Sequence, residues 1–70
     1  MTYNVGSKVA LFHFGKIEIG KILQIVKVTS SNSYYDILLE RGIELNKIPE
    51  RANKNSKSYI DKKITKKLNL

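Results

Sequence analysis

Several residue types are absent or scarce in this chain of 70 residues. It has no cysteine, no tryptophan, one proline and one histidine. Without cysteine, neither a disulfide framework nor a thiolate-zinc site can form. No apolar run approaches the roughly 20 residues that a membrane-spanning helix needs. A chain this short is expected to build one small folded body.

Acidic residues are also scarce: six Asp and Glu stand against thirteen Lys and Arg, a formal net charge of +7. Residues 1–49 carry six basic and four acidic side chains (+2), whereas residues 50–70 carry seven and two (+5). A basic surplus favours a polyanionic partner such as nucleic acid. However, Lys, Ile, Asn, Tyr and Phe make up 32 of the 70 residues. All five have A/T-rich codons, so an A/T-rich genome is an alternative origin of the lysines.

Residues 1–52 show the pattern of short strands separated by turn residues. Tyr35, Ile37 and Leu39 share one side of an expected strand, which leaves Asp36 on a solvated side. Residues 17–29 are apolar on both sides, which predicts a sharply bent strand, kinked near Gly20, that serves two sheets. The expected strands are residues 8–14, 17–29, 34–39 and 43–48.

Residues 53–70 comprise a polar connector and a basic amphipathic C-terminal segment. Ile60, Ile64 and Leu68 recur every fourth residue, which predicts a short helix with Ser58 as its N-cap and Asp61 in an approximate capping box. Alternatively, residues 59–60 form the last strand of the sheet. The expected fold is therefore mainly β, a small barrel of about five strands in residues 1–52 with a short helical basic segment after it.

Four stretches of the chain resemble a Tudor-type SH3-like barrel over about residues 5–52. They are Val-Gly-Ser-Lys-Val-Ala-Leu-Phe at 5–12, Gly-Lys at 15–16, Gly-Lys-Ile-Leu-Gln-Ile at 20–25 and Tyr-Asp-Ile-Leu-Leu-Glu-Arg-Gly-Ile-Glu at 35–44. Tudor domains that read methylated Lys or Arg surround the cation with aromatic rings. The corresponding positions here are His13, Glu18, Leu38 and Arg41. None is Phe, Tyr or Trp, so the resemblance implies the barrel but gives no support to methyl reading.

The sequence offers little for catalysis. Nucleophilic catalysis needs His or Cys beside a nucleophile, and a metal site needs three or four ligands. His13, flanked by Phe12 and Phe14, is the single histidine and supplies neither arrangement. We therefore expect no enzymatic activity, no cofactor and no metal.

The function expected instead is a non-catalytic module that associates with nucleic acid, or with a nucleic-acid-handling complex, through a basic surface. Basic side chains neutralise phosphates, and outward-facing aromatic rings stack on bases. Alternatively, the Phe residues belong to the core and the lysines only solubilise the chain. Without a sequence-reading motif, binding should be non-specific and salt-sensitive. The candidate residues are Lys16, Lys21, Lys27, Lys47, Arg51, Lys62, Lys63, Lys66, Lys67, Phe12, Phe14 and Tyr34.

The alternative function is a protein-interaction module that uses the barrel face or the amphipathic C-terminal segment. A phage or mobile-element accessory protein that binds a host factor would have this size and composition. The same segment could instead cover an open end of the barrel, and self-association would stabilise so small a body. No membrane partner is expected. No secretory-type signal follows Met1, which predicts a cytoplasmic location.

Overall fold

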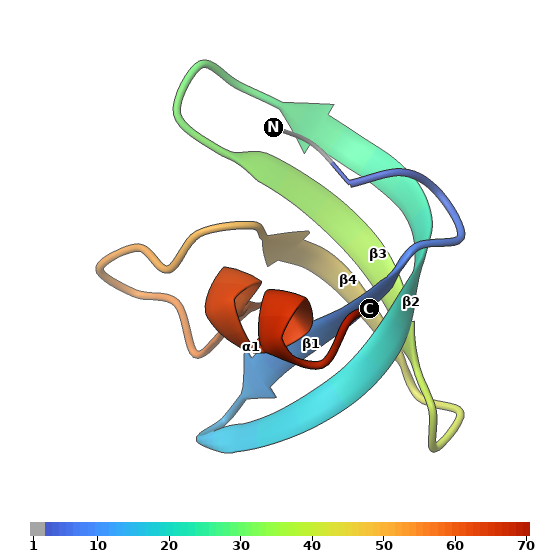
Figure 1. Cartoon of the computed structure of the whole chain (residues 1–70). Helices are drawn as coiled ribbons and strands as arrows, with labels where there is room; N and C mark the ends of the chain where they lie inside the picture. Colours follow the sequence, from blue (N-terminus) through green and yellow to red (C-terminus); the bar gives the residue numbers. More distant parts are fainter. Residues whose placement is uncertain (1–2) are drawn as a thin grey trace.

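The computed structural model describes residues 3–70 and consists mainly of antiparallel strands. The elements are β1 (Lys8–His13), β2 (Lys16–Val28), β3 (Ser33–Leu39), β4 (Glu44–Pro49), β5 (Ser58–Ile60) and α1 (Lys62–Lys67). The strands pair in the order β4-β3-β2-β1-β5 and curl into a half-barrel (Figure 1). The expected mainly β fold with five strands and a short C-terminal helix is confirmed. Within residues 3–70, no helix is long and apolar enough to cross a membrane.

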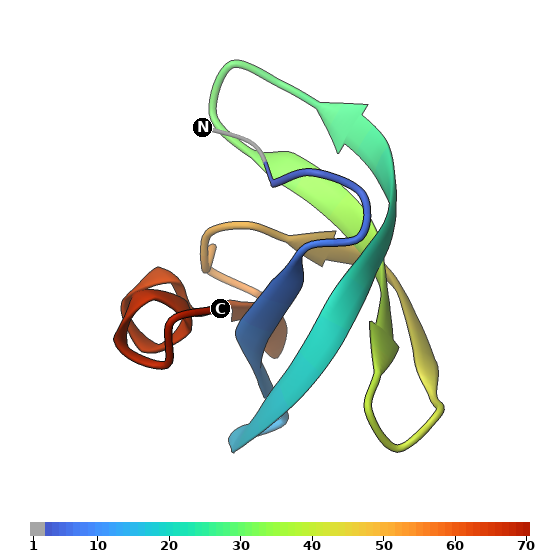
Figure 2. The ribbon, with the colours of Figure 1, turned by 45° about the vertical axis from the view of Figure 1, so that its right-hand side comes forward.

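The strand β2 is long and bent, as the sequence predicts. Its first half pairs with β1 and its second half with β3, and the two halves overlap around Gly20. Register irregularities between Ile22 and Gln24, and again further along, let the strand curl (Figure 2). A Cβ on Gly20 would lie 2.5 Å from the side chain of Ile37. Glycine is therefore required where β2 crosses so closely over β3.

The concave side of the sheet contains the hydrophobic core. The predicted inward side of β3 is confirmed, since Tyr35, Ile37 and Leu39 are fully buried. The two ends of the sheet, β4 and β5, contact each other without forming a ladder. The curl therefore encloses a core without closing a complete ring of hydrogen bonds. The core residues are Val9, Leu11, Ile22, Tyr35, Ile37, Leu39, Ile48 and Ile60.

The apolar side chains of β2 are not all buried. Ile22 is buried, but Ile17, Ile25 and Val28 are 50%, 41% and 60% exposed. The pairing of β2 with β1 stops at Lys21, and only short backbone contacts with residues 6–7 continue it. The far half of β2 therefore has a partner strand on one side only, which is β3. Ile25 and Val28 lie in this far half and extend past the sheet that would otherwise cover them, whereas Ile17 is exposed next to the β1–β2 hairpin tip.

The C-terminal segment divides differently from the predicted helix. Ser58–Ile60 forms the strand β5 against β1, as the alternative interpretation proposed, and the helix begins only at Lys62. Ser58 is therefore not the N-cap. Asp61 is, and its side chain accepts a hydrogen bond from the backbone N–H of Ile64 at 3.0 Å. Ile60 consequently belongs to the core of the sheet, not to a helical stripe.

A buried polar network ties four segments together. The hydroxyl of Tyr35 donates to Glu50 Oε1 at 2.7 Å and accepts from the backbone N–H of Tyr3 at 2.9 Å. The other carboxylate oxygen of Glu50 lies 3.7 Å from Lys62 Nζ. Desolvation by burial, followed by the bond to Glu50, raises the pKa of Tyr35. The network joins the N-terminal segment, β3, the end of β4 and α1.

Candidate nucleic-acid interface

The structure divides the residues predicted from the sequence into three groups. Phe12, Phe14 and Lys16 lie at the β1–β2 hairpin tip. Lys27, Tyr34 and Lys47 lie together on the far half of the sheet, where they line a hollow with Val26. The third group comprises the lysines of α1, whereas Lys21 and Arg51 line neither of the hollows of the first two groups and are not part of α1. The members of the third group are Lys62, Lys63, Lys66 and Lys67.

The helix α1 is held on the sheet by the hydroxyl of Thr65. The carbonyl of Ala10 accepts from the backbone N–H of Asp61 at 2.9 Å, just past the end of β5. The N–H of Ala10 donates to Thr65 Oγ1 at 2.8 Å. The Thr65 hydroxyl therefore occupies the position that a further residue of β5 would have taken, and it satisfies a backbone group at the edge of β1 that would otherwise be unpaired. As a result, α1 lies beside β1 on the outer side of the sheet (Figure 2).

The helix presents a dense group of cations. All four lysines of α1 are exposed within six residues. Lys62 approaches Glu50, whereas Lys63, Lys66 and Lys67 form no ion pair within residues 3–70. Lys66 and Lys67 occupy the last turn, where the helix dipole favours positive charge. The fold therefore collects three uncompensated cations on one short element.

The β1–β2 hairpin turns through two residues with left-handed backbone. Phe14 has φ 49° and Gly15 has φ 81°, between the paired residues His13 and Lys16. Positive φ at both central residues is typical of the type I′ hairpin turn. The Phe14 side chain is 67% exposed, and its ring meets the His13 ring edge-on at 4.8 Å. Of the two Phe residues, Phe14 is therefore exposed and outside the core.

Phe12 is half-buried and stacks on Tyr59, which the sequence analysis did not select. Their ring centroids lie 5.6 Å apart with planes 28° from parallel, because the β1–β5 register pairs the two residues directly. Phe12 and Ala10, two residues apart on β1, face the same side, so the aromatic pair lies next to α1. In the sequence, only the alternative interpretation of residues 59–60 as a strand pointed to a place for Tyr59 in the sheet. Phe12, Phe14, Tyr59, Gly15, Ser56 and Lys57 line one hollow.

Most acidic side chains are committed to internal contacts. Glu18 forms a two-bond ion pair with Arg41 at 2.7 and 2.9 Å, and the hydrogen bond from Arg41 lowers the pKa of Glu18. Asp36 and Glu50 are buried, and Asp61 caps α1. The two exposed carboxylates, Glu40 and Glu44, flank the β3–β4 turn, which lies on the far side of β2 from α1 (Figures 1 and 2). The surface around α1 is consequently left to lysine.

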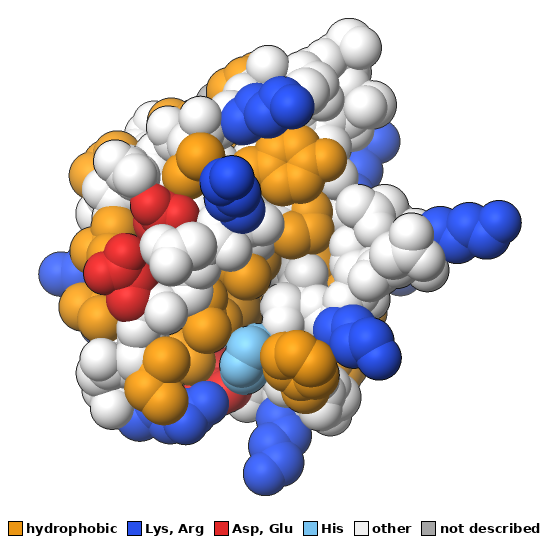
Figure 3. Space-filling view, turned by 180° about the vertical axis from the view of Figure 1, so that it is seen from behind, with side chains coloured by type: hydrophobic (Ala, Val, Ile, Leu, Met, Phe, Trp, Pro, Cys, Tyr) orange, Lys and Arg blue, Asp and Glu red, His pale blue; other side chains and the backbone are white. Residues whose placement is uncertain are grey.

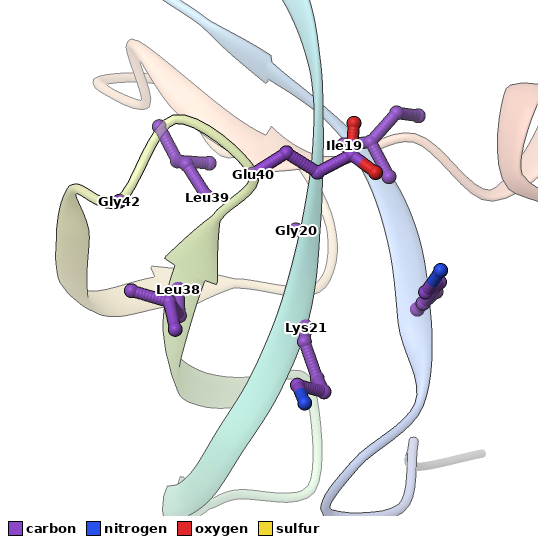
Figure 4. A pocket seen from close by; sticks show the side chains of 8 residues that line it. Ile19, Gly20, Lys21, Leu38, Leu39, Glu40 and Gly42 are labelled. Atoms are coloured by element: carbon purple, nitrogen blue, oxygen red, sulfur yellow. The ribbon is translucent and has the colours of Figure 1, made fainter.

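A third hollow lies over Gly20 and is less suited to phosphate. Lys8 and Lys21 line it together with Ile19, Leu38 and Glu40. The Glu40 side chain extends across β2 toward Ile19, so a carboxylate shares this hollow with the two lysines (Figure 4). On the face turned away from the view of Figure 1, Lys and Arg side chains stand mostly singly around a band of hydrophobic side chains (Figure 3). Positive charge is therefore scattered on that face.

The positions that correspond to an aromatic cage are occupied by other contacts. Glu18 and Arg41 pair with each other, and His13 Nδ1 lies 2.7 Å from Ser58 Oγ. These side chains provide no box of rings for a methylated cation. In the part of the chain that the structure describes, no group of three or more His, Cys, Asp and Glu is placed to hold a metal ion.

Comparisons of the chain with protein-family models, with curated proteins and with solved structures found no match. Its function is therefore inferred from its own residues.

Proposed function

We propose that this protein is a small non-catalytic module that binds nucleic acid through α1 and the adjoining hairpin tip. The observation that carries the proposal is the density of lysine on α1, where four exposed cations occupy six residues and three of them have no acidic partner in the described chain. Nucleic acid presents phosphates at a comparable density. Each lysine that neutralises a phosphate releases a condensed counterion.

The placement of the helix supports this function. Because Thr65 docks α1 on the outer side of β1, its lysines project from a rigid scaffold. The aromatic pair Phe12–Tyr59 lies on the same side of the sheet, two residues beyond Ala10 along β1. Both rings of this pair are half-buried, and the exposed ring of Phe14 lies at the adjoining hairpin tip. Cations next to accessible rings are the combination that proteins use to contact single strands. No element within residues 3–70 is shaped to read base edges in a groove, so the expected binding is independent of sequence.

We also propose that the half-barrel is a Tudor-type SH3-like barrel. The strand order, the long bent β2 shared by two halves of the sheet and the glycine at its bend support this assignment. Methyl-lysine or methyl-arginine reading is not part of the proposal. The fold contributes a scaffold, and the function depends on the residues placed upon it.

The apolar residues of the C-terminal segment favour this function over docking in a partner's groove. Ile60 is in the core, Ile64 is half-buried, and Thr65 is the buried residue of α1, so Leu68, at 51%, is the one exposed member of the predicted stripe. The apolar stripe is therefore largely used within the fold, and the helix turns mainly lysine outward.

Two charge-matched triple variants test the location of the interface. Lys63→Gln/Lys66→Gln/Lys67→Gln should weaken binding to a generic single-stranded oligonucleotide at low salt by roughly tenfold or more, because three phosphate contacts are lost. Lys21→Gln/Lys27→Gln/Lys47→Gln removes the same charge elsewhere and should weaken binding less. Equal losses would place the interface outside α1. Wild-type protein that does not bind at low salt would contradict the nucleic-acid function itself.

A further inference from the structure

Neither the geometry of the turn nor packing in the core explains why phenylalanine occupies position 14 at the hairpin tip. The type I′ geometry at residues 14–15 is best served by Asn-Gly, because asparagine adopts left-handed backbone more readily than other side chains. Phe14 stands there instead, with φ 49° and a side chain that is 67% exposed. A bulky residue in sparsely populated backbone, without burial to compensate it, points to a role outside folding.

Three aromatic rings converge on the hollow beside this tip. The Phe12 and Tyr59 rings stack on each other, and Phe14 adds a third ring at the edge of the same hollow. The backbone N–H of Phe14 donates to the carbonyl of Lys57 at 2.9 Å. That bond fixes the tip to the connector before β5. The hollow is therefore preformed by β1, the tip and the connector.

The hollow is edged by positive charge. Lys57 lines it, Lys16 follows Gly15 directly, and Lys54 lies in the same connector. No acidic residue lines the hollow, and none of these three lysines forms an ion pair within residues 3–70. A hollow lined by three aromatic residues and bordered by cations suits a planar ligand that carries negative charge beside it. A cationic ligand would be repelled by the same lysines.

We propose that this hollow binds an unpaired base of single-stranded nucleic acid. The base stacks against the aromatic rings, while Lys57 and Lys16 contact the flanking phosphates. A duplex hides the faces of its bases, so the site selects single strands. This inference rests on the proposed function, in which α1 supplies the main phosphate contacts, and it adds the chemical group that the tip recognises.

Fluorescence anisotropy at low salt with labelled strands of about 12 nucleotides separates stacking from charge. The probes are oligothymidine, oligouridine, an abasic strand of the same length and charge, a duplex, and vesicles of anionic lipid. Stacking contributes about 5- to 150-fold in affinity per base. Oligothymidine or oligouridine should therefore bind at least several times more tightly than the abasic strand. A comparison of the affinities for oligothymidine and oligouridine shows whether the site prefers DNA or RNA.

Phe14→Asn provides the decisive variant, because asparagine fits the turn and the hairpin should still form. It should remove most of the preference for the base-bearing strand, roughly a tenfold loss, and leave the affinity for the abasic strand unchanged. Tyr34→Thr is the matched control, since Tyr34 lies in a different hollow. Its binding to both strands should equal that of the wild type.

Each contrary result overturns a definite part of the proposal. Equal wild-type affinity for base-bearing and abasic strands would overturn the stacking site while leaving the function of α1 intact. Loss of binding in Tyr34→Thr but not in Phe14→Asn would move the site to the other hollow. Binding to none of the nucleic acids would overturn the stacking site and the proposed function together. Binding to vesicles alone would assign the exposed rings to a lipid surface instead.

Discussion

Asp36 shows how a residue on an apparently solvated side of a strand becomes part of the structure. Its side chain is buried, and Gln24 Nε2 donates to Oδ2 at 2.6 Å while the backbone N–H of Lys47 donates to Oδ1 at 3.1 Å. The bulges in β2 and β4 bring these donors over β3. The hydrogen bond from Gln24 is the main cause of the lowered pKa of Asp36. One carboxylate thereby joins three strands.

Asp36→Asn should lower the stability at neutral pH and flatten its dependence on acid. The folded-state pKa of Asp36 lies below its unfolded value of about 3.9, so the carboxylate stabilises the fold fully above that value. This contribution is lost as the pH falls through the folded-state pKa. Denaturant unfolding of both proteins between neutral pH and about pH 2 measures the effect. Parallel stability curves through the acid limb would show that Asp36 does not contribute in this way.

The junction of β5 and α1 is the element on which the interface depends. The strand ends at Ile60, Asp61 caps the helix, and the hydroxyl of Thr65 then takes over the hydrogen bond with Ala10. A three-residue strand and a helix of six residues would not be stable alone. Their positions therefore depend on β1, and the orientation of the α1 lysines depends on the contacts of Thr65 and Asp61 with Ala10.

Thr65→Val should destabilise the protein by about 1–3 kcal/mol, because valine keeps the shape but leaves the buried N–H of Ala10 without an acceptor. Thr65→Ser keeps the hydroxyl and should cost less. Denaturant unfolding measures both changes, and amide hydrogen exchange at Ala10 locates them. If valine and serine gave the same stability, the hydroxyl would have no part in docking α1.

The elements that could be predicted from the sequence are those with a pattern of their own. Alternation in residues 35–39 identified the core side of β3, and apolar residues on both sides of residues 17–29 identified the bend in β2. The β5–α1 boundary could not be placed in this way, because Ser58–Ile60 becomes a strand only through its pairing with β1. For the same reason Tyr59 was missed, since its contact with Phe12 follows from register between segments more than forty residues apart.

Across the whole molecule, the net charge of +7 is distributed unevenly by the fold. Four of the six acidic residues are used in internal contacts, namely Glu18, Asp36, Glu50 and Asp61. The two that remain exposed flank the β3–β4 turn, on the far side of β2 from α1. Lysine therefore dominates the side of the sheet that carries α1 and the aromatic hollow. An electrostatic partner would be drawn first to that side.

The salt dependence of binding to a single-stranded oligonucleotide tests the nucleic-acid function most directly. The three lysines of α1 without an acidic partner, Lys63, Lys66 and Lys67, provide about four phosphate contacts together with Lys57. The logarithm of the association constant should therefore fall linearly with the logarithm of salt concentration, with a slope of about −3. Anisotropy titrations over a salt series measure this slope. A slope near zero, or no binding at the lowest salt, would contradict the function proposed for this protein.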